Sequence, residues 1–206
     1  SSDQVIIKGI SIISSTSLTN NAGSNTINSS NSHLKLENCK IYSATHSAVY
    51  SSGKSSDTVI KKCSISCAHD IGLWLNEYAN ARIEESVFYA CGGHGISLTN
   101  GSKAIIKKSE IIKNSDGGIL VSHNSSLLAD DTTFKNNKFG IIVNSGSSIT
   151  LTHCSITNNK DTGVIVFDRS KADIKKSEFS TNHFASLSFS ESLDISIYKC
   201  KIHTNK

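Results

Sequence analysis

The chain has 206 residues, of which 37% are hydrophobic and 18% are charged, with a formal net charge of +4 and neither proline nor methionine. This length is typical of a single domain, and a small charge of mixed sign does not indicate a nucleic-acid-binding protein. No apolar run approaches the ~20 residues that a membrane-spanning helix requires, so we expect neither a nucleic-acid nor a membrane partner.

In chain order, the first predicted element is the β-type run of residues 5–12. It matches the start of the repeat described below, so we interpret it as an early copy of that repeat. Residues 16–32 follow and are rich in Ser, Thr and Asn. This composition predicts a loop insertion that bulges from the domain.

From residue 36 onward one pattern recurs every 22–24 residues. Each copy opens with the same column of mostly large apolar residues: Leu36, Ile60, Ile83, Ile106, Ala129, Leu151, Ile174 and Ile197. A second apolar column follows five positions later: Ile41, Ile65, Phe88, Ile111, Phe134, Ile156, Phe179 and Ile202. Most copies then contain a glycine and a short apolar run. A sequence pattern that recurs at one fixed period predicts a repeat architecture.

Each copy holds two or three short β-type runs separated by Asn, Gly, Ser and Asp, and no 3.6-residue period is long enough for a helix. Three short strands per copy, stacked in register, predict a parallel β-helix. The pattern resembles the right-handed parallel β-helix repeats of the pectate-lyase-like superfamily over nearly the whole chain. The resemblance implies an all-β, right-handed, single-stranded parallel β-helix (a β-solenoid) of about nine coils, forming one domain over residues 1–206.

Two further columns have structural interpretations. We predict that Ile111, Phe134, Ile156 and Phe179 form one continuous inward stack. Asparagine tolerates left-handed turn geometry and hydrogen-bonds neighbouring backbone, so a ladder is predicted for Asn114, Asn137, Asn159, Asn182 and Asn205.

Four of the six cysteines, Cys39, Cys63, Cys154 and Cys200, share one inward column that Ser and Thr fill elsewhere. We therefore interpret them as small, free core residues rather than as disulfides or metal ligands, and expect no metal and no cofactor. Unpaired thiols favour an intracellular compartment.

The two ends of the predicted rod expose apolar interior and unpaired strand edges, which promote aggregation. Solenoids need terminal caps, and the sequence contains no methionine. We therefore expect a fragment of a larger protein, in which a partner or a flanking domain of the same chain covers the ends.

One stretch carries catalytic residue types. Gly93 to Ser97 reads G-H-G-I-S, which resembles a motif of the polygalacturonases, inverting hydrolases built on this fold. That family places an Asp pair one coil earlier; here His69 stands at the first position and Asp70 at the second. The Arg-Ile-Lys that the family places one coil later is absent.

A different carboxylate pair is Asp70 and Asp116, which lie two coils apart in the column two residues before the repeat glycine. Strand spacing places them ~9–10 Å apart, near the ~6.5–9.5 Å that separates the carboxyls of inverting glycosidases. His94 lies on the coil between them. The alternative interpretation is that Asp70, His94 and Asp116 are ordinary turn residues. Pectate lyases, which share the fold, use calcium-binding acids and a catalytic Arg, and this chain has only two arginines, Arg82 and Arg169.

A binding face is predicted from the column two residues past the repeat glycine. Strand side chains alternate between faces, so this column points outward if its neighbours point inward. The predicted binding residues are Tyr50, Trp74, Leu120, Ile142, Ile165 and Phe167. Contiguous exposed apolar surface marks interaction sites; the aromatic end suits a sugar and the aliphatic end suits a protein.

Two functions remain open from the sequence. The first is a non-catalytic binding or scaffold module of a larger protein, similar to the β-helix domains of certain F-box and Shc-binding proteins, with a protein partner on the apolar column. The alternative is a carbohydrate-active enzyme, hydrolase or lyase-like, that acts on a polysaccharide with Asp70, His94 and Asp116.

Overall fold

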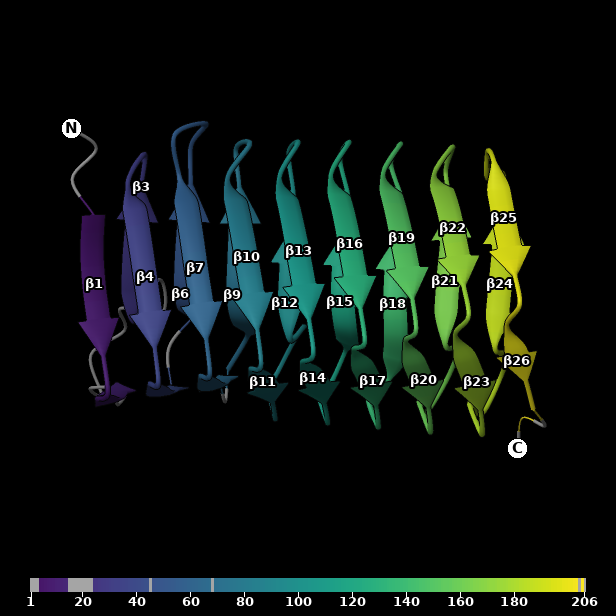
Figure 1. Cartoon of the computed structure of the whole chain (residues 1–206), viewed down its shortest axis with the longest axis horizontal. Helices are drawn as coiled ribbons and strands as arrows, with labels where there is room; N and C mark the ends of the chain where they lie inside the picture. The colour runs from purple at the N-terminus through teal and green to yellow at the C-terminus, as the bar shows by residue number, and fades with distance from the viewer. Residues whose placement is uncertain (1–3, 15–23, 45, 68, 204, 206) are drawn as a thin grey trace.

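The computed structural model describes residues 4–14, 24–44, 46–67, 69–203 and 205. In these ranges the chain winds into a right-handed parallel β-helix, a rod whose coils follow one another from the N-terminus to the C-terminus (Figure 1). The strands form three parallel sheets, A, B and C, with nine, nine and eight strands among the described residues. This arrangement confirms the predicted fold class.

Sheet A contains β1 Gln4–Lys8, β4 His33–Glu37, β7 Asp57–Lys61, β10 Asn80–Glu84, β13 Lys103–Lys107, β16 Ser126–Asp130, β19 Ser148–Thr152, β22 Lys171–Lys175 and β25 Ile195–Tyr198. Sheet B contains β2 Ser11–Ser14, β5 Lys40–Ser43, β8 Ser64–Cys67, β11 Val87–Tyr89, β14 Glu110–Ile112, β17 Thr133–Lys135, β20 Ser155–Thr157, β23 Glu178–Ser180 and β26 Lys201–Ile202. Sheet C contains β3 Ile27–Ser30, β6 Ser47–Ser52, β9 Ile71–Asn76, β12 Ile96–Leu98, β15 Gly117–Val121, β18 Phe139–Val143, β21 Val164–Phe167 and β24 Leu187–Ser190.

The predicted loop of residues 16–32 needs a correction. Its residues 16–23 lie outside the described part of the chain, and Ile27–Ser30 forms β3, the first strand of sheet C. The polar composition concealed this strand, because a strand at the end of a sheet pairs with only one neighbour and buries few side chains. In β3 only Ser29 is buried.

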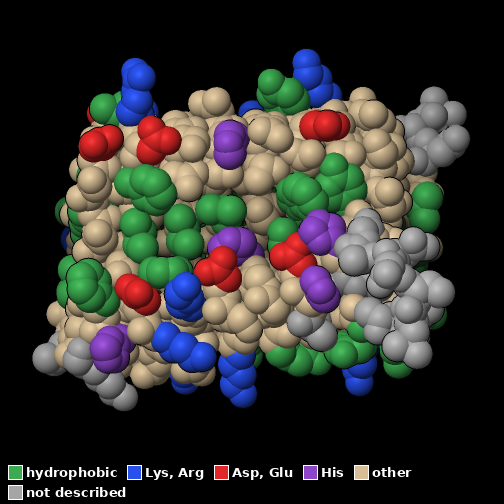
Figure 2. Space-filling view, turned by 180° about the vertical axis from the view of Figure 1, so that it is seen from behind, with side chains coloured by type: hydrophobic (Ala, Val, Ile, Leu, Met, Phe, Trp, Pro, Cys, Tyr) green, Lys and Arg blue, Asp and Glu red, His purple; other side chains and the backbone are tan. Residues whose placement is uncertain are grey.

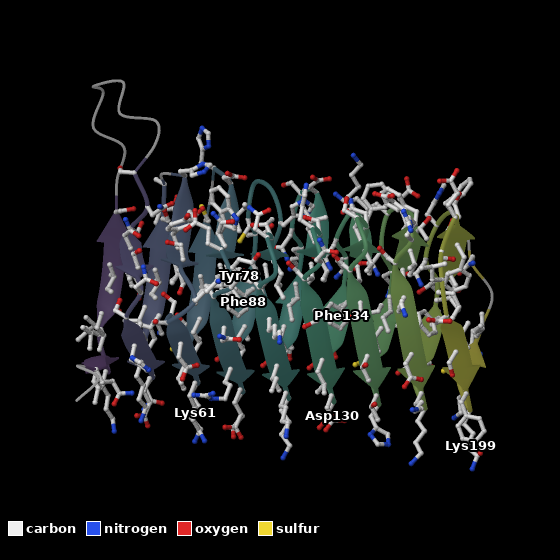
Figure 3. The ribbon with its side chains drawn as sticks, turned by 90° about the horizontal axis from the view of Figure 1, so that it is seen from above. Lys61, Tyr78, Phe88, Asp130, Phe134 and Lys199 are labelled. Atoms are coloured by element: carbon white, nitrogen blue, oxygen red, sulfur yellow. The ribbon has the colours of Figure 1, made fainter. Side chains whose placement is uncertain are left out.

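The core is a set of side-chain columns that run along the rod. Ile111, Phe134, Ile156 and Phe179 are paired in register across β14, β17, β20 and β23 and are fully buried, as predicted. Figure 3 shows Phe88 and Phe134 pointing into the space between the sheets, whereas Lys61 and Asp130 project outward. Because side chains alternate sides along each strand, the outer faces of the sheets remain available for function.

The asparagine ladder fills the corner between sheets B and C. Oδ1 of Asn137 accepts hydrogen bonds from the backbone N–H (3.0 Å) and from Nδ2 (2.9 Å) of Asn114, one coil earlier. Nδ2 of Asn137 donates to the carbonyl of Ile111 at 3.0 Å. Asn159 and Asn182 repeat this geometry. Each of these buried polar atoms therefore gains a partner from a neighbouring coil, which fixes the register of the stack.

The corner between sheets C and A has a ladder of its own, which the repeat pattern did not predict. The backbone N–H groups of Ser102, Ser125 and Ser147 donate to the hydroxyl one coil later at 3.1–3.2 Å. At the corner between sheets A and B, Cys63 and Ser86 donate to the hydroxyl of the next coil in the same way. Five of the six cysteines are buried, and the four of the predicted column, Cys39, Cys63, Cys154 and Cys200, are free thiols. Burial raises the pKa of the Cys91 thiol to about 12.

Both ends of the described rod expose apolar side chains. Val5 and Ile6 are exposed at the N-terminal end, and Ile197 and Ile202 at the C-terminal end. The described part of the chain contains no helix long and apolar enough to cross a membrane.

Candidate functional site

The three candidate catalytic residues lie on the outer surface at the N-terminal ends of three consecutive strands of sheet C. Asp70 precedes β9, His94 lies two residues before β12, and Asp116 precedes β15. The rear view shows histidine, acidic and lysine side chains in a row that borders hydrophobic side chains (Figure 2). The fold thus brings the three residues to one face.

Asp70 is held by a histidine from the preceding coil. Nδ1 of His46 lies 2.8 Å from Oδ2 of Asp70. The other carboxylate oxygen, Oδ1, lies over Gly93 of the following coil, only 2.7 Å from the position that a Cβ would occupy there. Gly93 therefore leaves room for the free oxygen of Asp70, on the side that faces Asp116.

His94 occupies the coil between the two acids and is nearly buried, with a side chain 14% exposed. Its Nε2 lies 3.4 Å from Oδ2 of Asp116. Its Nδ1 packs over Gly117, 2.6 Å from the position of a Cβ there, and has no hydrogen-bond partner among the residues that the structure describes. With a proton on Nε2 facing Asp116, Nδ1 carries a lone pair, but this atom is buried over Gly117.

Burial lowers the pKa of His94 below its ordinary value of 6.5, and the carboxylates of Asp116 and Asp70 oppose this effect in part. The neutral imidazole is therefore the resting form at neutral pH. On acidification, the imidazole of the unfolded chain is protonated at a higher pH than that of the folded chain. The stability that the neutral imidazole contributes to the fold is fully present above pH 6.5, begins to be lost as the pH falls through 6.5, and is completely lost below the folded-state pKa.

We expect the imidazole of His94 to titrate with a midpoint below 6.5, followed by NMR of its ring protons as the pH is lowered. Asp116→Asn should move this midpoint further down, because the variant removes a carboxylate that favours the charged imidazole. A midpoint above 6.5 in the unmodified chain would mean that the two carboxylates outweigh burial.

Two residues of the row were not identified as functional from the sequence, although they stand in the same column as Asp70 and Asp116. They are His46, which contacts Asp70, and Lys138, whose Nζ lies 3.9 Å from Oδ1 of Asp116. A shared column position predicts proximity on the rod, and it could have identified both. His69, which stands where the polygalacturonases have an acid, is exposed.

The aromatic end of the predicted binding column is an ordered cluster. The ring of Trp74 packs edge-on against Tyr50, with centroids 5.0 Å apart, and against His46 at 5.6 Å. The indole Nε1–H donates to Oγ1 of Thr99 on the next coil at 3.0 Å, so Trp74 extends across β12. This position explains why Ser97, in the same outward column, is only 2% exposed.

The aliphatic end of the column lies farther toward the C-terminus. Leu120, Ile142 and Ile165 are paired in register and half-buried, between neighbours on each strand that are fully buried. Phe167 is also half-buried, near the end of β21. These side chains point outward, as the alternation predicts.

Ile142→Lys should leave the melting temperature nearly unchanged, because the new ammonium group extends into solvent. The matched substitution one residue earlier, Ile141→Lys, should unfold the domain, because Ile141 is fully buried and an unpaired buried charge is strongly destabilising. Thermal denaturation followed by circular dichroism compares the two. An equal decrease in melting temperature for the two variants would mean that the outward column is packed as tightly as the core.

Among the described residues, no group of three His, Cys, Asp or Glu side chains is arranged to hold a metal ion. The site consists of two carboxylates, a buried imidazole and an aromatic cluster. This set can transfer protons and pack against the face of a sugar ring.

Comparisons with known proteins agree with this architecture. The sequence model of a family described as "Right handed beta helix region" matches residues 2–139 and 106–206. A variant of the periplasmic alginate epimerase AlgG aligns with a TM-score of 0.73 at 14% identity, over 87% of this chain and 48% of that one. The pectate lyase Pel9A aligns with a TM-score of 0.63 at 11% identity, over 98% of this chain and 70% of that one. This chain thus spans about half the length of the epimerase. No curated protein sequence matches it.

Proposed function

This chain belongs to the right-handed β-helix family, and from this premise we propose that it is a carbohydrate-active enzyme that hydrolyses glycosidic bonds in a polysaccharide bound on the outer face of sheet C. The observation that carries the proposal is the pair of carboxylates, Asp70 and Asp116, separated by a glycine-containing coil from which a buried neutral imidazole projects.

The separation of the two acids suits hydrolysis with inversion. Their strands lie two coil spacings apart, ~9–10 Å, and Oδ1 of Asp70 reaches over Gly93 toward Asp116. The carboxyl groups of inverting enzymes lie ~6.5–9.5 Å apart, which leaves room for the attacking water between them.

The contacts of the two acids support different roles for them in this proposal. Asp116 faces Nε2 of His94 and Nζ of Lys138, so its oxygens act as acceptors and it serves as the base that activates water. Asp70 protonates the departing glycosidic oxygen through Oδ1, which reaches over Gly93, while His46 holds its Oδ2 in place at 2.8 Å. His94 holds Asp116 in place through Nε2, while its Nδ1 is buried over Gly117 and does not reach the substrate.

The aromatic cluster positions the polymer. Trp74 lies on β9, which Asp70 directly precedes, and Tyr50 lies on β6, which His46 directly precedes. A sugar ring packed against Trp74 therefore places its neighbour near the acids. Aromatic rings offer a large, rigid apolar surface at low entropic cost.

The similar structures support a carbohydrate-active enzyme better than the protein-binding scaffold that was the first expectation from the sequence. Their names refer to an alginate epimerase and a pectate lyase, both enzymes of polysaccharides. The aliphatic column is only half exposed, which gives a scaffold partner little apolar area. A protein partner on this column remains a separate proposal, tested by partner capture with the Ile142→Lys variant.

The test is incubation of the chain with polygalacturonate, alginate, xylan and a neutral glucan, followed by measurement of new reducing ends. We expect reducing ends from at least one of them, with inverted anomeric configuration in the first products by NMR. Unsaturated sugar ends would instead indicate elimination, and altered sugar composition without cleavage would indicate epimerisation; either would replace hydrolysis as the reaction. Absence of any change in all four polymers would refute the enzymatic proposal.

A further inference from the structure

A groove crosses the outer face of sheet A, the sheet nearest the viewer in Figure 1 and distinct from the face that carries Asp70 and His94. It has a volume of about 580 Å³ and spans β7, β10, β13, β16 and β19. Five strands correspond to four coil spacings, a length of about 19 Å along the rod. The groove is therefore long, shallow and parallel to the rod axis.

The two walls of the groove differ in chemistry. One wall consists of the first outward residue of each strand: Asp57, Asn80, Lys103, Ser126 and Ser148. The other wall consists of the third residue of successive strands: Arg82, Ile105, Leu128 and Thr150. Ile105 and Leu128 are 42% and 41% exposed in its centre. An aliphatic strip thus faces a row of hydroxyl, amide and ammonium groups.

The charges of the groove are not balanced at its centre. Arg82 closes the N-terminal end by an ion pair with Asp57 across the groove. Lys103 is exposed and makes no ion pair with any residue that the structure describes. The hydroxyls of Ser126 and Ser148 likewise make no side-chain hydrogen bond within the described ranges. Among the described residues that line the groove, one free cation and two free hydroxyls therefore face the aliphatic strip.

We propose that this groove is a second, non-catalytic binding site for a linear acidic polysaccharide. The apolar C–H faces of successive sugars pack on Ile105 and Leu128, their hydroxyls exchange hydrogen bonds with Asn80, Ser126 and Ser148, and a sugar carboxylate pairs with Lys103. Wall residues recur at the strand spacing of ~4.8 Å, which suits a polymer of repeating units.

A peptide suits the groove less well. The floor strands pair on both sides, so their backbone groups are occupied and an extended peptide cannot add as a further strand. Its own backbone N–H and C=O groups would then lie unpaired against Ile105 and Leu128, which is costly. The described residues that line the groove include no aromatic side chain and form no deep pocket for an anchoring residue.

The proposal rests on sheet A alone and does not depend on catalysis by sheet C. The test measures migration of the full chain in native gels containing alginate, a linear acidic polysaccharide, or dextran, a neutral one. Lys103→Ala combined with Leu128→Ser should bind alginate about tenfold more weakly than the unmodified chain, a change of ~1.4 kcal/mol. Both side chains are exposed, so the melting temperature should remain unchanged.

The matched control is Lys107→Ala, which removes an exposed lysine from the same strand, β13, outside the groove. It should retain alginate binding. An equal loss in this control, equal retardation by dextran, or displacement of alginate by polyglutamate at equal charge would each overturn the proposal. As a measurement without substitutions, saturating alginate should protect Lys103 but not Lys107 from acetylation.

The outcomes separate this site from the catalytic one. A chain that binds alginate through Lys103 but changes no polysaccharide would refute the enzymatic proposal and leave the groove intact. A chain that cleaves polysaccharide but binds alginate equally well with and without Lys103 and Leu128 would refute the groove alone.

Discussion

Asp70→Asn is expected to lower polysaccharide hydrolysis by about a hundredfold to ten-thousandfold, the range for loss of a general acid or base. The amide keeps the size of the carboxyl group and one oxygen that accepts from His46, which lies 2.8 Å away. It cannot hold and release the proton that the glycosidic oxygen requires. The measurement is the rate of reducing-end release, with the melting temperature showing that the fold is retained.

The matched control for Asp70→Asn is Asp161→Asn. Asp161 stands in the same column of the repeat, two residues before Gly163, but its Oδ1 accepts from Thr162 and it lies two coils beyond Asp116. This variant should keep nearly full activity. If Asp70→Asn stayed as active as Asp161→Asn, the assignment of Asp70 as the proton donor would be wrong.

Phe134→Ala is expected to reduce the free energy of unfolding by about 3–5 kcal/mol, the range for removal of a large core side chain. Phe134 is fully buried between Ile111 and Ile156, its register partners on the coils before and after. These neighbours belong to strands that are paired on both sides, so they cannot collapse into the space that the ring leaves. Chemical denaturation of the two proteins measures the difference.

Phe184→Ala provides the same chemical change at a surface position, since Phe184 is 77% exposed. It should change the free energy of unfolding by no more than about 0.5 kcal/mol, as is usual for surface substitutions. A loss below about 1 kcal/mol for Phe134→Ala would be small for a core truncation, and it would show that the coils relax around the missing ring.

The sequence by itself determined the architecture, because a parallel β-helix repeats its hydrogen bonding at a constant number of residues per coil. Equivalent positions therefore become neighbours in space, and counting was enough to place Phe134 in the inward stack and Asn137 in a ladder. The same counting placed Asp70 and Asp116 on one face. The strand Ile27–Ser30 escaped detection because its polar residues resemble a loop, although it pairs in register with β6.

Only the tertiary structure decided how the side chains on each face use their surroundings. The column positions do not predict that Oδ1 of Asp70 lies over Gly93, that Trp74 donates a hydrogen bond to Thr99, or that burial lowers the pKa of His94. The groove on sheet A was also hidden, because its two walls belong to columns that are two residues apart and chemically unrelated in sequence. Periodicity fixes which backbones are adjacent, whereas rotamers, desolvation and surface shape depend on the side chains of at least three coils acting together.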